Sequence, residues 1–130
     1  MTIDRADATN LQAVADAALA VGDVESAAIF TQAPGSTELE LAAAAGIEGL
    51  PLDGLVAAVQ NPMHPIARAM LDAGPTFDVR PMNPGGPTLR SHLPLGGLGV
   101  LAVAHDASLD AEQRASLEEL AIAATDLLRG

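Results

Sequence analysis

Residues 89–105 read LRSHLPLGGLGVLAVAH and form the most informative stretch of the chain. In residues 89–95, Leu or Ser alternates with Arg, His or Pro, which is the pattern of a strand with two different faces. Residues 98–105 are almost all apolar, which is typical of a central strand covered on both faces. Gly96 and Gly97 stand between the two segments and supply a turn. The stretch therefore predicts a β-hairpin in the middle of a sheet.

Both ends of the chain have the spacing of an amphipathic helix. In residues 4–21 apolar side chains recur every three or four positions, and Gly22 offers a stop. In residues 110–128 a similar stripe follows Asp110, which is placed to form a capping box with Gln113, and Arg129 supplies a cation at the helix end. The two stripes are Leu11, Val14, Ala15, Ala18 and Leu19, and Leu117, Leu120, Ala121, Ala124, Leu127 and Leu128. Because each helix has a single apolar stripe, we expect both to cover the same face of the sheet.

The middle of the chain completes the sheet. Residues 25–32 and 38–45 predict an earlier hairpin with turn residues between its strands. Short helices are expected at 55–59 and 66–73, a strand at 76–80, and a loop at 81–87, where three prolines remove backbone donors. This order predicts a single α+β domain over residues 1–130, with an antiparallel sheet of about five to six strands. We expect the terminal helices on one face and a small pocket on the other, and the initial Met suggests a complete small protein.

Composition and charge exclude several classes of partner. The 130-residue chain has 17 acidic and 6 basic side chains, which gives a formal net charge of −11. The six basic residues are arginines scattered along the chain, so no basic stripe exists to hold nucleic acid or an anionic membrane. The two aromatic residues, Phe30 and Phe77, are expected in the core. Because we find no membrane-spanning run and no signal peptide, we expect a cytoplasmic protein.

Catalysis and bound cofactors find little support in the sequence. There is no cysteine, which removes thiolate nucleophiles and Cys-ligated metal sites. Ser36, Ser91 and Ser108 have no His and acidic residue at the spacing of a nucleophile motif. The three histidines are not spaced as metal ligands. We therefore expect no enzymatic activity, no metal and no cofactor.

Three segments resemble the GAF family of small-ligand sensor domains. They are HPIARA at residues 64–69, LPLGGLGVLAV at 93–103 and LDAEQR at 109–114, and the resemblance extends over residues 11–128. It implies an antiparallel sheet with the terminal helices on one face and a ligand cavity on the other. Relatives that bind cyclic nucleotides, haem or bilins usually have a longer middle segment, so a large cofactor is disfavoured. The absence of cysteine sets aside a covalent bilin and methionine sulfoxide reductase activity.

The candidate ligand-binding residues are all basic: Arg68, Arg80, Arg90, His64 and His92. In a chain of charge −11, an arginine that faces a cavity offers a fork for a carboxylate or phosphate. In the GAF-like arrangement the three arginines border the cavity, which predicts a small anionic metabolite as the ligand. The alternative is that these arginines pair with Asp72, Asp78 or nearby glutamates.

The histidines allow both structural and functional interpretations. His64 either caps the helix that begins at Pro65 or lines the pocket. His92 shares a strand face with Arg90, and this face is either a polar pocket wall or a solvated side of the sheet. His105 ends its strand, and we expect it at the surface.

Two functional hypotheses follow. The first is a small-molecule-sensing or regulatory domain. The second is an interaction module whose pocket is filled by side chains and whose terminal helices form a homodimer. For that homodimer, the small residues Ala13, Ala17 and Ala20 of the first helix, with Ile122 and Ala123 of the last, are the candidate contacts.

Overall fold

The computed structural model describes residues 5–22, 24–32, 39–46, 68–69, 74–79, 89–105 and 107–129. Its elements are α1 (Arg5–Leu19), β1 (Val24–Gln32), β2 (Leu39–Ala45), β3 (Thr76–Val79), β4 (Leu89–Pro94), β5 (Gly99–His105) and α4 (Ala111–Arg129). The strands form one antiparallel sheet in the order β2-β1-β5-β4-β3. The predicted α+β class, both hairpins and both terminal helices are confirmed. The helix expected at 55–59 and the loop expected at 81–87 lie outside the described residues.

The β4–β5 hairpin lies where its sequence pattern predicts. Leu93 pairs with Leu101 across the ladder, and every residue of β5 is buried. Gly96 and Gly97 have φ angles of 65° and 80°, values at which any residue with a Cβ is strained. Two glycines therefore let the chain reverse within a short turn and return as the central strand.

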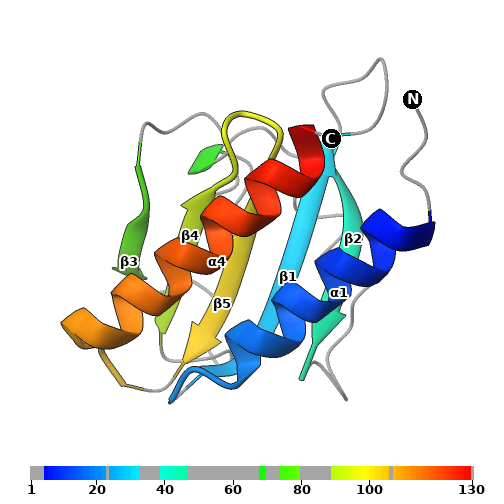
Figure 1. Ribbon diagram of the computed structural model, residues 1–130. Coiled ribbons are helices and arrows are strands. Elements are labelled where there is room, and N and C mark those ends of the chain that lie inside the picture. Colours follow the sequence, from blue (N-terminus) through cyan, green and yellow to red (C-terminus); the bar gives the residue numbers. More distant parts are fainter. Residues whose placement is uncertain are drawn as a thin grey trace.

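The terminal helices cover one face of the sheet. In Figure 1, α1 and α4 lie side by side in front of the strands and run in opposite directions. Their stripes pack on alternate residues of the strands, which places Ile29, Leu93, Leu101 and Val103 under the helices. The core on this side is aliphatic, and this confirms the predicted placement of both helices on one face.

The opposite face of the sheet has a smaller apolar cluster. It consists of Ala28, Phe30, Leu39, Ala69, Val100 and Ala102, all buried. Phe30 is fully buried, as expected for a core residue. Ala69 comes from the middle of the chain and packs against the face that the terminal helices leave free. Residues 68 and 69 are helical, within the helix expected at 66–73.

Two local features fix the ends of the long elements. Asp110 and Gln113 form the predicted capping box, in which the Gln113 N–H donates to Oδ1 of Asp110 at 2.8 Å and the Asp110 N–H donates to Oε1 of Gln113 at 2.9 Å. The Gln113 amide also donates to the carbonyl of Gly22 at 2.7 Å, which joins the start of α4 to the chain after α1. Gly99 opens β5 so close to β1 that a Cβ there would overlap the carbonyl oxygen of Phe30. No helix among the described residues has the length and apolar character needed to cross a bilayer.

Candidate functional site

Arg90 and His92 lie on the sheet face opposite to the terminal helices. Within the antiparallel ladder, Arg90 pairs with Ala104 and His92 pairs with Ala102. Ala102 belongs to the apolar cluster of that face, and directly paired residues point to the same side. His92 is 3% exposed and Arg90 is partly buried. The solvated-side interpretation is therefore wrong for His92, and Arg90 is partly covered. That the two side chains form the wall of a pocket stays a prediction.

The partial burial of Arg90 affects the charge of its guanidinium. Desolvation lowers the pKa of Arg90 below its ordinary value, because an apolar environment disfavours the charged guanidinium. Among the described residues no carboxylate forms a salt bridge with Arg90. An anion placed beside Arg90 would supply the opposite charge that none of the described carboxylates supplies through a salt bridge.

The other predicted site residues are only partly placed. The side chain of Arg68 is exposed, next to the buried Ala69. His64 and Arg80 lie outside the described residues, so the convergence of Arg68, Arg80 and Arg90 stays a prediction. The expected alternative of a pair with Asp78 is wrong for Arg68 and Arg90, because that carboxylate binds Arg114 instead.

A second group of polar residues lies under the helices, although the strand-end position of His105 predicts exposure. His105 is fully buried, so its expected surface position is wrong. Its Nδ1 lies 2.8 Å from the carbonyl oxygen of Ala107, which can only accept, so Nδ1 carries the proton. Nε2 then accepts from the Ser91 hydroxyl at 2.9 Å, and the same hydroxyl oxygen accepts from the Asp78 N–H at 3.1 Å.

Asp78 extends this network from the sheet to α4. Its Oδ2 lies 2.6 Å from Nη2 of Arg114, and its Oδ1 accepts from the Leu109 N–H at 3.1 Å. Arg114 also donates through Nε to the Leu109 carbonyl and lies over the ring of Phe77, 5.0 Å from its centroid. Asp78 has a φ of 58°, in the left-handed region that Asp tolerates better than most residues. The network thus binds β3, β4, β5 and the start of α4 together.

The Ser91–His105 pair has the separation of a nucleophile and its base, but not the access. Both residues are 0% exposed, and the hydroxyl is hydrogen-bonded on both sides. A reacting carbonyl would have to approach the Ser91 oxygen, which the helices and strands enclose. The described part of the chain also has no group of three His, Asp or Glu residues that could hold a metal ion. The hydrogen bonds of Ser91 and His105 therefore stabilise the fold.

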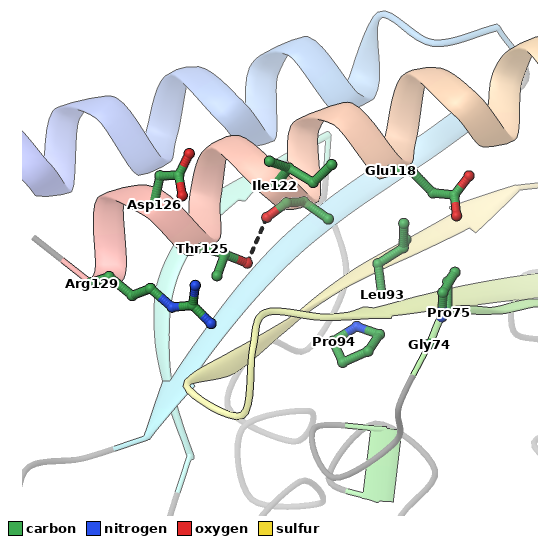
Figure 2. Close-up of a pocket in the computed structure, with 10 residues that line it drawn as sticks. Gly74, Pro75, Leu93, Pro94, Glu118, Ile122, Thr125, Asp126 and Arg129 are labelled. Atoms are coloured by element: carbon green, nitrogen blue, oxygen red, sulfur yellow. Dashed lines mark hydrogen bonds between the residues drawn. The ribbon is translucent and has the colours of Figure 1, made fainter.

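A groove lies on the helix side of the sheet, between α4 and β4 (Figure 2). Its volume is about 310 Å³. The pocket expected from the sequence was on the opposite face, and much of the chain that would enclose it lies outside the described residues. That expected pocket stays a prediction, and the groove along α4 is a separate feature.

Comparison with solved structures identifies the architecture. The second GAF domain of DevS from Mycobacterium smegmatis matches this chain with a TM-score of 0.70 and 24% sequence identity, over 95% of this chain and 93% of that one. This chain has the GAF fold. The GAF domain from Acinetobacter phosphoenolpyruvate-protein phosphotransferase matches with a TM-score of 0.72 and 11% identity, over 95% of this chain and 82% of that domain.

A third solved structure has a similar backbone. A methyl-accepting chemotaxis protein, in its residues 122 to 287, matches with a TM-score of 0.72 and 19% identity, over 98% of this chain and 90% of that one. No protein-family model and no curated protein matches the sequence. The likeness therefore lies in the backbone architecture. It confirms the GAF-like fold that the three sequence segments predict.

Proposed function

We propose that this GAF-fold chain is a small-molecule-sensing or regulatory domain, and that its ligand is a small anionic metabolite bound at the sheet face that carries Arg90 and His92. The fold supports the general role, since similar structures include a part of a methyl-accepting chemotaxis protein and a GAF domain of a phosphotransferase. The anionic character of the ligand rests on this chain's own residues.

The observation that carries the proposal is the burial of Arg90 beside His92. A guanidinium with a pKa lowered by desolvation is costly to keep in the fold, and a bound carboxylate or phosphate relieves this cost by forming charge-assisted hydrogen bonds. Arg68 and Arg80 are further candidates to contact the anion, and His64 is a candidate for the pocket rim. The Ser91–His105 pair is enclosed and occupied, which supports binding rather than catalysis.

The experiment is a ligand screen by thermal unfolding with nucleotides, oxo-acids and amino acids as probes. A ligand at a hundred times its Kd adds about 2.7 kcal/mol to the stability, which raises the Tm by roughly 10 °C for a chain of this length. We expect the rise in the unmodified protein and in Arg129→Met, whose arginine is exposed at the end of α4. We expect no rise in Arg90→Met. The proposed site would be contradicted if no probe raised the Tm, or if the rise in Tm persisted in Arg90→Met.

A homodimer through the terminal helices is the second candidate. The observation that favours it is the exposure of Ala13 and Ala17, which lie one turn apart on α1, and of Ala20, which follows the end of that helix. Small side chains let a second helix approach closely. Light scattering of the unmodified protein should then give twice the monomer mass. The Ala17→Glu variant should give the mass of the monomer. A monomer at all micromolar concentrations would refute this candidate.

A further inference from the structure

The groove along α4 has an apolar lining with a charged border. β4 contributes Leu93 and Pro94, Pro75 comes from just before β3, and α4 contributes the residues that face them in Figure 2. Leu93 and Ala121 are buried, at 1% and 7% exposure. The Thr125 hydroxyl donates to the Ala121 carbonyl at 2.8 Å, so its polar group is already satisfied within the helix. The interior of the groove therefore suits an apolar side chain.

Ile122 marks the side of the groove that faces solvent. It is 63% exposed and is the large hydrophobic side chain left exposed among the described residues. A single exposed aliphatic residue is common on protein surfaces, but this one borders a concave surface with other apolar groups. It is positioned to contact whatever enters the groove.

The charged residues around Ile122 indicate which kind of molecule the groove can bind. Glu118 and Asp126 both line the groove and lie one helical turn before and after Ile122 on the same side of α4. Arg129 lies further along, where its guanidinium is close to the Gly96 turn. The exposed aliphatic side chain is thus set between two carboxylates, which attract a cationic partner.

A second copy of this chain fits the groove poorly. A two-fold antiparallel contact of α4 helices centred on Ile122 would bring Glu118 of each copy against Asp126 of the other. Four carboxylates would then surround one apolar contact, and each chain carries a net charge of −11. Like charges set opposite each other at an interface are unfavourable, so this face disfavours self-association. The like charges therefore remove Ile122 from the candidate contacts of the homodimer, which then depends on Ala13, Ala17 and Ala20.

We propose that this groove is a docking surface for a basic segment of another protein. The segment inserts one aliphatic side chain between Ile122 and Pro94 and places lysine or arginine side chains against Glu118 and Asp126. This surface lies on the helix side of the sheet and is separate from the proposed anion site. It gives the domain a place to contact a partner without covering Arg90 and His92.

The test measures binding of a short fluorescein-labelled helical peptide by fluorescence anisotropy. The peptide has a central leucine with a lysine one turn before and one turn after it, in an alanine background. A second peptide has alanine at the centre. We expect the leucine peptide to bind, the alanine peptide to bind at least about tenfold more weakly, and added salt to weaken both. Equal affinity for both peptides would overturn the proposal, because it would show only attraction to an acidic protein.

Variants of the whole chain locate the surface. Glu118→Gln and Asp126→Asn should each weaken the leucine peptide by about three- to fivefold, and Ile122→Ser by about tenfold. Glu119→Gln is the matched control, because it removes the same charge from an exposed residue of α4 that does not line the groove. An equal loss in Glu119→Gln would overturn the proposal.

Sedimentation and circular dichroism complete the test. The sedimentation coefficient should be the same for the unmodified protein and Ile122→Ser. If Ile122→Ser instead converts a dimer to a monomer, the groove holds a second copy and the proposal is wrong. Circular dichroism should show the native helix signal in every variant, since all four side chains are exposed and none belongs to the apolar core clusters.

Discussion

Replacing Ser91 with Ala should destabilise the folded chain by about 2–4 kcal/mol. The hydroxyl donates to Nε2 of His105 and accepts from the Asp78 N–H, so its removal leaves two polar atoms without their partner. The imidazole is 0% exposed, and a buried group that loses its hydrogen bond costs about 1–3 kcal/mol. The Asp78 amide costs less, because Asp78 lies in an edge strand and is only partly buried.

Thermal unfolding monitored by circular dichroism is the suitable assay. The chain has no Trp and no Tyr, so intrinsic fluorescence gives little signal, whereas two long helices give a strong dichroism band. The expected loss corresponds to a fall in Tm of roughly 7–15 °C for a domain of this length. Urea unfolding should show the same change in the free energy of unfolding with an unaltered slope.

Ser108→Ala is the control for the Ser91 prediction. Ser108 is exposed just before α4, so its loss should change the stability by no more than about 0.5 kcal/mol. If Ser91→Ala lies within the same range, then the hydroxyl does not satisfy His105, and the proposed proton arrangement of the network is wrong.

Three further predictions test other parts of the fold. Gly99→Ala should lower the stability by roughly 1–3 kcal/mol, because the new Cβ would overlap the Phe30 carbonyl. Gly74→Ala should change the stability little, because there is open space around its Cβ. Thermal unfolding compares the two variants. Asp110→Ala should cost about 1 kcal/mol by removing the cap of α4, measured by urea unfolding. The Tm of Arg90→Met should match or exceed that of the unmodified protein throughout about pH 6–8. Burial lowers the pKa of Arg90, but the guanidinium keeps its proton in this pH range in both the folded and the unfolded chain. The free-energy cost of burying its charge therefore does not vary with pH in this range.

Periodic patterns predicted most of the fold. The alternation in residues 89–95 and the apolar run in 98–105 gave a hairpin with a central strand, and the structure has it as β4 and β5. Asp110 with Gln113 marked the start of the last helix, because a capping box is a local motif. These features depend on residues close together in the sequence, so they can be predicted without knowledge of the tertiary structure.

The polar network and the groove depend on contacts that no local pattern contains. His105 stands at the end of a strand, where exposure is common, but Ser91, fourteen residues earlier, satisfies it across the hairpin. Asp78 binds Arg114 across 36 residues. The groove lies between α4 and β4, two elements whose lining residues are far apart in the sequence, so it depends on how these elements pack. One signal was present: Ser91 and His105 occupy the same face of the predicted hairpin.

The left-handed backbone at Asp78 also affects how the sheet ends. β3 is an edge strand of four residues, and its register with β4 shifts between Thr76 and Val79, where Asp78 interrupts the ladder. A foreign strand needs an unbroken row of free amides and carbonyls to add to an edge, and a bulge denies it one. At the other edge, β2 turns the carboxylate of Glu40 to solvent. The bulge in β3 and the exposed carboxylate of β2 are both features that disfavour the addition of a foreign strand to a chain rich in alanine and leucine.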